Sequence, residues 1–206
     1  SVFAGEVQIE ISAELTVSAF AGQFFGELSL LSGRRRSATV VAGNDCVVIE
    51  TPRRTMNKLL SSVASAKRVL DETFILRTIQ SRFAPSASIE DLLPIAQHAE
   101  LNEFGPGEAL FLEGDDADAL HLVRSGSVAV LKTHNGEEVP LAYVPAGQHV
   151  GEMGLLGGHT RTATIRAAVR AQTVSIDADS FKQLLALSPT LEPVSYTHLT
   201  LPTISD

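Results

Sequence analysis

The chain has 206 residues, of which 44% are apolar, and a net charge of −8 from 24 acidic and 16 basic side chains. This length allows one or two domains that each bury a core. The composition excludes a disordered chain, and no apolar run is long enough to span a membrane. The acidic charge argues against nonspecific nucleic-acid binding. The single cysteine, Cys46, excludes an intrachain disulfide and a thiolate metal site. We expect a cytoplasmic protein.

The first 51 residues have the pattern of β-strands. Val7, Ile9 and Ile11 alternate with polar neighbours, which is typical of a half-buried strand. A later strand is predicted over Cys46–Ile49. Within it, Cys46 is expected to be a small, buried apolar side chain.

From Thr51 the period changes to that of helices. Pro52 suits a first helical turn, and apolar residues then recur at helical spacing as far as Phe83. We therefore predict one long helix or two consecutive helices. Residues 84–88 interrupt them, with Ser88 as the N-cap of a further helix.

Strands are predicted to resume over residues 101–176, followed by a helix over 179–185. Within the strand-rich parts, one short pattern occurs twice, over 25–42 and 150–167. Each copy has Gly-Glu, an apolar run, a loop, and then Arg-Ser/Thr-Ala-Thr-Val/Ile-x-Ala. The glutamate and arginine are nine residues apart in both copies (36 − 27 and 161 − 152).

The residue types of this pattern suit a small sugar phosphate. An arginine presents a planar fork of donors to two phosphate oxygens and stays charged, while the glutamate can accept a hydrogen bond from a ribose hydroxyl. Glycine lets the backbone approach the ligand, and the N–H groups of the next turn, 28–31 or 153–156, would point at an anion. The hydroxyl of Ser37 or Thr162 can add a donor.

The two copies resemble the phosphate-binding cassette of the cyclic nucleotide-binding domain family; they read FGELSLLSGRRRSATVVA and VGEMGLLGGHTRTATIRA. That family includes the catabolite activator protein, regulatory subunits of cyclic-AMP-dependent protein kinase, and cyclic-nucleotide-gated channels. Around the second copy the likeness extends to Phe104–Glu108, Glu113–Asp115 and Gly126–Val130. Two departures are Val150, where an aromatic residue is more usual, and Gly154, where alanine or serine is common.

The resemblance implies a mostly β fold with flanking helices: two tandem β jelly-roll barrels joined by a helical connector. We expect a partial barrel over 1–51, the connector over 52–84, a complete cyclic nucleotide-binding domain over 85–193, and a non-native tail over 194–206. A bacterial source is also expected.

The first barrel is predicted to lack its opening strands. Gly126-x-Val128-x-Val130 corresponds to Gly5-x-Val7-x-Ile9, yet only four residues precede Gly5. Missing strands would leave unpaired edges and an open core. We therefore expect the chain to be a piece of a longer protein.

The resemblance assigns ligand contacts to two sets of residues and predicts no catalytic residue, metal or cofactor. The sets are Gly151, Glu152, Met153, Gly154, Arg161, Thr162 and Ala163 in the second cassette, and Gly26, Glu27, Leu28, Ser29, Arg36, Ser37 and Ala38 in the first. Cyclic AMP is the expected ligand, with a weak preference over cyclic GMP. The first pocket has a candidate lid over 63–83 and the second has a complete barrel, so we expect the second to bind better.

Other interpretations of these residues stay open. Each Glu-Arg pair could be a structural ion pair, and some members of the family keep the fold without a ligand. Arg34–Ser37 also resembles a basophilic kinase site or a nucleic-acid patch. The six histidines lack the spacing of a metal site, although His159 could approach the ligand.

We expect a regulatory module and not an enzyme. By resemblance, the phosphate draws the cassette into a closed form and the following helices move with it, to the extent that the ligand prefers that form. The segment 52–83 would transmit the change. The expected partners are a cyclic nucleotide and a protein effector or effector domain, with no direct nucleic acid and no membrane span. The alternatives are the sensor of a transcription regulator, with a helix-turn-helix after residue 192, and a structural module that binds no nucleotide.

Overall fold

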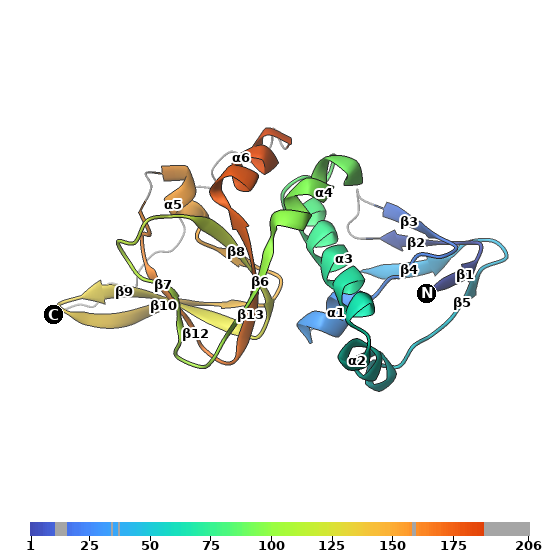
Figure 1. Cartoon of the computed structure of the whole chain (residues 1–206), viewed down its shortest axis with the longest axis horizontal. Coiled ribbons are helices and arrows are strands. Elements are labelled where there is room, and N and C mark those ends of the chain that lie inside the picture. Colours follow the sequence, from blue (N-terminus) through green and yellow to red (C-terminus); the bar gives the residue numbers. More distant parts are fainter. Residues whose placement is uncertain (11–15, 34, 37, 158–159, 188–206) are drawn as a thin grey trace.

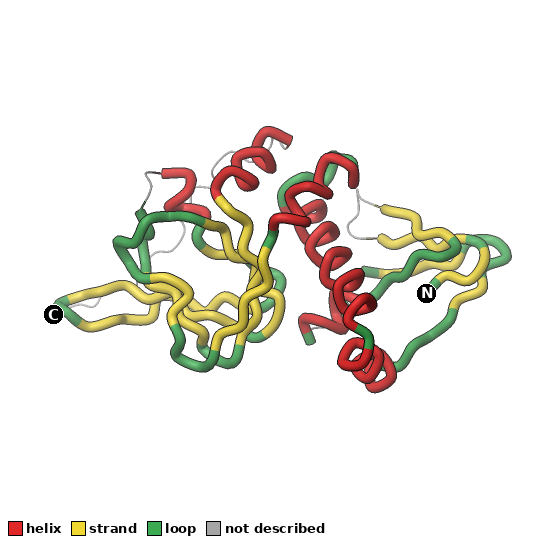
Figure 2. Tube along the Cα trace, in the orientation of Figure 1, coloured by secondary structure: helices red, strands yellow, loops and turns green. Residues whose placement is uncertain are grey.

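The structure of the protein is a computed structural model that describes residues 1–10, 16–33, 35–36, 38–157 and 160–187. Figure 1 shows a β-rich unit at each end of the molecule with helices between them. Figure 2 shows the helices in red between the yellow strands of the two units. Ile11 and the predicted tail 194–206 lie outside the described residues.

The first unit contains five strands and one short helix within the described residues. They are β1 (Val2–Ala4), β2 (Glu6–Glu10), β3 (Thr16–Phe20), α1 (Glu27–Ser32), β4 (Thr39–Ala42) and β5 (Val47–Val48). One sheet has the order β3-β2-β4, and a second pairs β1 with β5. All of these pairings are antiparallel.

The core of the first unit is small. Its buried members are Val2, Val7 and Ala19. The exposed large apolar side chains of this unit are Phe3, Phe20, Val40, Val41, Val47, Val48 and Ile49. Apolar side chains on both sheets of this unit are thus exposed in the part of the chain that the structure describes.

Cys46 differs from its prediction. It is half-buried rather than buried, and the strand that follows it is only Val47–Val48. Among the described strands, β5 pairs with β1 alone.

Three helices connect the two units: α2 (Arg53–Ser62), α3 (Ala64–Arg82) and α4 (Ile89–His98). The extended backbone of Val63, with φ of −129°, separates α2 from α3, so the alternative of two consecutive helices is correct. Ser88 caps α4 as predicted, because its side chain accepts a hydrogen bond from the Asp91 N–H. No helix among the described residues is both long and apolar enough to cross a membrane.

Among its described residues, the second unit contains two four-stranded antiparallel sheets. Its strands are β6 (Glu100–Phe104), β7 (Ala109–Phe111), β8 (Ala119–Ser125), β9 (Ser127–His134), β10 (Glu137–Pro145), β11 (His149–Val150), β12 (Thr164–Ala167) and β13 (Ala171–Asp177). The sheet orders are β10-β9-β12-β7 and β11-β8-β13-β6. Two helices accompany them, α5 (Glu152–Gly157) and α6 (Ala178–Leu187). These paired sheets form the predicted jelly roll.

The two units repeat one topology down to the strand register. In the first, Val7 lies opposite Ala42, and in the second Val128 lies opposite Ala167. The glycine before each strand, Gly5 or Gly126, has a positive φ of 70° or 76°. The order β3-β2-β4 therefore corresponds to β10-β9-β12, with no described partner in the first unit for β7.

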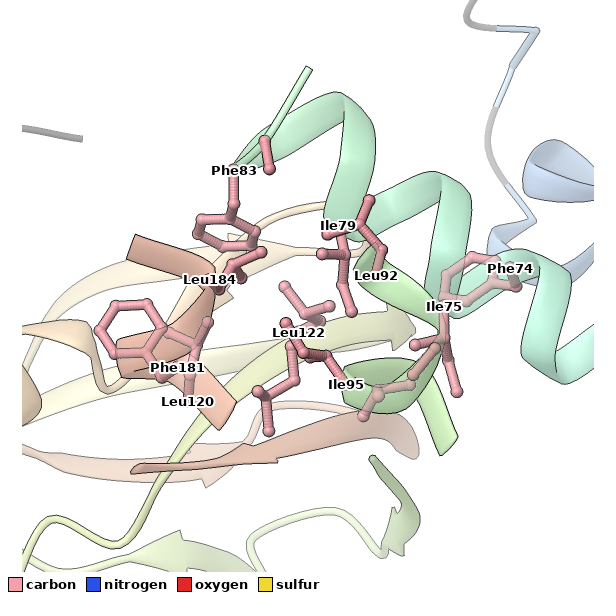
Figure 3. Close-up of a cluster of buried hydrophobic side chains, with 14 residues drawn as sticks. Phe74, Ile75, Ile79, Phe83, Leu92, Ile95, Leu120, Leu122, Phe181 and Leu184 are labelled. Carbon is pink, nitrogen blue, oxygen red and sulfur yellow. The ribbon is translucent and has the colours of Figure 1, made fainter. Parts of the chain in front are cut away.

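The largest apolar cluster lies where the connecting helices meet the second barrel (Figure 3). The cluster takes Phe74, Ile75 and Ile79 from α3, joined by side chains of α4, β8, β13 and α6. Leu28 and Leu31 of α1 pack against it, half-buried. The first cassette therefore contacts the same core as the second barrel.

Candidate functional site

Both Gly-Glu pairs stand at the start of a short helix, as the sequence predicts. Gly26 precedes α1 with φ of 83°, and Gly151 precedes α5 with φ of 94°, a region of backbone space that favours glycine. The arginine of each cassette folds back onto its glycine. Nη1 of Arg36 donates to the Gly26 carbonyl at 2.9 Å, and Nη1 of Arg161 donates to the Gly151 carbonyl at 3.1 Å.

In the second cassette the guanidinium of Arg161 is enclosed. Arg161 is 2% exposed, its carbon Cζ lies 3.9 Å from the centroid of the Phe111 ring, and its Nη2 donates to Asp118 at 2.6 Å. Its Nε is buried and has no hydrogen-bond partner among the described residues. A buried cation with an unused donor suits an anionic ligand, since an unpaired buried donor costs free energy.

Three residues of this pocket were missed by sequence reasoning: Asp118, Phe111 and His121. Burial acts to raise the pKa of Asp118, but the hydrogen bonds from the backbone and from Arg161, together with the positive charge of Arg161, outweigh it, so the pKa is lowered. His121 is buried with its ring 5.6 Å from that of Phe111, and burial, aided by the positive charge of Arg161, lowers its pKa to about 4. All three lie before the cassette in sequence, in or beside β7 and β8, so the repeat gave no signal for them.

The first cassette is arranged differently around its arginine. Arg36 is exposed, and its Nη1 also donates to the hydroxyl of Ser29 at 2.8 Å. Glu27 is 3% exposed and accepts a hydrogen bond from Nη1 of Arg77 at 2.6 Å. Arg77 also donates to the Phe24 carbonyl at 2.7 Å. Sequence reasoning missed Arg77 because it lies on the connecting helix α3, fifty residues after Glu27.

The predicted site residues divide by burial. Glu27, Ser29, Gly154 and Arg161 are buried, whereas Arg36, Met153 and Thr162 are exposed; the others described are half-buried, namely Gly26, Leu28, Ala38, Gly151, Glu152 and Ala163. Ser37, Arg34 and His159 lie outside the described residues. Among the described groups, no cluster of His, Cys, Asp or Glu could hold a metal ion.

In the described structure, the glutamate and the arginine of a cassette do not pair with each other, so the alternative of a Glu-Arg structural ion pair within each cassette is wrong. Glu27 pairs with Arg77 and Arg161 pairs with Asp118. Neither cassette arginine is therefore held by the glutamate nine residues before it.

Gly151→Ala is expected to destabilise the protein by about 2 to 4 kcal/mol, from left-handed backbone strain together with overpacking. A methyl group there would lie 2.6 Å from Nη1 of Arg161 and 3.2 Å from the Ala119 carbonyl. Gly136→Ala is the matched control, since Gly136 has φ of 84° and no atom within 4 Å of the added carbon. Urea unfolding compares them, and an equal loss in both variants would contradict the crowding at Arg161.

His121 predicts a pH dependence of stability. Its pKa is about 4 in the folded chain and 6.5 ordinarily, so the unfolded chain binds the proton more readily. The folded state is therefore favoured where His121 is neutral in both states. This contribution to the unfolding free energy is fully present above pH 6.5 and is lost as pH falls toward 4. Between pH 7 and pH 4.5, His121 alone should remove about 2 to 3 kcal/mol of unfolding free energy. His121→Phe should show a smaller loss in urea unfolding, and identical pH profiles would refute the prediction.

The comparisons with known proteins agree with this architecture. The model of the family described as "Cyclic nucleotide-binding domain" matches residues 2–63 and 101–188. The chain is 30% identical over 174 residues to a cAMP-dependent protein kinase regulatory subunit of Mycosarcoma maydis, covering 82% of this chain and 33% of that protein. It is 32% identical over 168 residues to the corresponding subunit of Yarrowia lipolytica, covering 82% and 44%. These relatives are fungal, so the expectation of a bacterial source is not supported.

A solved structure shows the same fold. The regulatory domain of Toxoplasma gondii PKA, co-crystallised with cAMP, matches with a TM-score of 0.52 and 22% identity over 89% of this chain and 72% of that chain. The chain spans between a third and a half of the length of the two curated relatives. Both are named as regulatory subunits of a cAMP-dependent protein kinase.

Proposed function

The chain belongs to the cyclic nucleotide-binding domain family, and we propose that it senses a cyclic nucleotide. Cyclic AMP is the preferred ligand over cyclic GMP in this proposal, because the relatives named above are regulatory subunits of cAMP-dependent kinases. The observation that carries the proposal is the guanidinium of Arg161. It is buried, it lies on Phe111 and beside the Gly151 carbonyl, and its Nε has no hydrogen-bond partner within the described chain. The cyclic phosphate would supply the missing acceptor.

Binding would exchange one anion for another at this guanidinium. Asp118 now accepts from Nη2, and its side chain is largely exposed, so it can turn to solvent when a phosphate takes its place. Glu152, at the start of α5, would accept from the ribose. The binding free energy gained at Arg161 is therefore the difference between the buried contact with the phosphate and the exposed contact with Asp118.

Helix α3 is the proposed transmitter because it contacts both cassette regions. Arg77 of α3 pairs with Glu27 in the first cassette. Phe83, directly after α3, lies 5.0 Å, centroid to centroid, from the ring of His149, two residues before Gly151. A shift at either cassette therefore acts on the same helix.

The proposed effector is a protein kinase catalytic subunit, because the relatives named above are regulatory subunits of such a kinase. This support favours a kinase over a transcription regulator as the output. A cytoplasmic location stays a prediction.

Calorimetric titration of the full chain with cyclic AMP, cyclic GMP and linear AMP tests the proposal. We expect saturable heat with cyclic AMP, less with cyclic GMP at equal concentration, and none with linear AMP. Absence of heat with both cyclic nucleotides at about 1 mM, the weak end of specific binding, would overturn it.

A further inference from the structure

A buried cation lies where the connecting helices meet the second barrel. Arg124, in β8, is 4% exposed, and its Nη2 donates to Oδ1 of Asp71 on α3. The guanidinium also lies over the ring of Phe74, with Cζ 5.3 Å from the centroid. Phe74 belongs to the apolar cluster that joins α3 to the barrel (Figure 3).

The carboxylate of Asp71 has a second cationic partner on its own helix. Nζ of Lys67 lies 3.0 Å from Oδ2, and that lysine side chain is about half exposed. Asp71 is thus held by one cation from α3 and one from β8. The link to Arg124 is the one that joins different elements.

Burying the charge of Arg124 costs free energy that an apolar side chain of similar size would not cost. Its Nε is buried with no hydrogen-bond partner in the described part of the chain. Desolvation of a buried ion pair can exceed its attraction, and an apolar residue of similar size is often as stable. The surrounding apolar contacts are non-directional, so they permit α3 to slide or rotate on the barrel, whereas an ion pair fixes one arrangement.

We propose that Arg124 and Asp71 form a positioning pair that fixes the orientation of α3 on the second barrel. Because Arg77 ties the same helix to Glu27, the pair also sets the orientation of the first unit. Leu28 and Leu31 of α1 pack on the shared core and follow this placement. The role in coupling the two cassettes rests on the proposed function, but the placement of the units does not.

The test measures the arrangement of the units directly. Spin labels are attached to cysteines at Gln8 in β2 and Tyr143 in β10, both exposed, in a Cys46→Ser background of the full chain. Electron–electron resonance then gives the distance distribution between them. The test variants are Asp71→Asn and Arg124→Met. Glu72→Gln is the matched control, because Glu72 is the next residue on α3 and its carboxylate lies 3.9 Å from Nε of Arg68 in an exposed pair.

We expect a narrow distribution in the parent and in Glu72→Gln, and a broader or shifted one in Asp71→Asn and Arg124→Met. Arg124→Met should keep the thermal unfolding midpoint of the parent, because methionine fills the same space and Asp71 retains Lys67. An unchanged distribution in both test variants would overturn the proposal, and so would an Arg124→Met chain that does not fold. If Asp71→Asn fails to fold, Arg124→Met decides.

Addition of cyclic AMP to the same labelled proteins separates the two proposals. A distance change in the parent that is absent from both test variants supports coupling through the pair. If the parent shows no calorimetric binding, the proposed function is contradicted. The distances measured without nucleotide still test whether Arg124 and Asp71 fix the orientation of α3.

Discussion

Arg161→Ala is expected to weaken cyclic AMP binding at the second cassette by about 2 to 5 kcal/mol, which corresponds to about 30- to 5,000-fold in Kd. The guanidinium is the buried cation of this pocket, and its removal leaves the phosphate desolvated without a partner of opposite charge. Calorimetry of the full chain measures the loss.

Arg170→Ala is the control for net charge. Arg170 has a side chain that is 80% exposed and pairs at the surface with Glu103, so its removal should leave the Kd unchanged. Thermal unfolding of both variants shows whether the fold is retained. Equal Kd values for the parent and Arg161→Ala would reject the assigned phosphate contact, even if the chain binds cyclic AMP.

The repeated cassette was predictable from sequence because it is local. The Gly-Glu pair, the short helix and the returning arginine lie within one short segment of each copy, and both copies show the same contact from arginine to the glycine carbonyl. The strands that follow Gly5 and Gly126 were equally predictable, because the alternation of apolar and polar residues fixes which face of a strand is buried. The extent of the helices followed from their apolar period.

The partners of the cassettes were not predictable, because tertiary packing supplies them. Asp118 reaches Arg161 across 43 residues, and Arg77 reaches Glu27 across 50. Neither Asp118 nor Arg77 belongs to a motif. Asp118 lies in the loop before β8, close in sequence to Asp115 and Asp116, and Arg77 is one of several charged residues on α3. The alternative of an ion pair within each cassette is wrong for the same reason, because Glu27 and Arg161 pair with these distant residues.

Arg77→Met should lower the free energy of unfolding, because it breaks the Glu27–Arg77 pair. Glu27 is 3% exposed and its Oε2 is buried without a hydrogen-bond partner in the described structure, so loss of Arg77 leaves an uncompensated carboxylate. Breaking a buried pair costs about 3 to 5 kcal/mol. Because the Arg77 side chain is 29% exposed, solvent screening reduces the expected loss to about 1 to 3 kcal/mol.

The double variant Glu27→Gln with Arg77→Met separates charge from packing. If the loss in Arg77→Met comes from the stranded carboxylate, neutral glutamine at position 27 should recover much of it in urea unfolding. Arg68→Met is the matched control on α3, since that side chain is 76% exposed and should change the unfolding free energy by less than about 0.5 kcal/mol. A double variant as unstable as the sum of its single changes would show that Arg77 acts through its other contacts, to the Phe24 carbonyl and ring, and that the first cassette is not tied to α3 by charge.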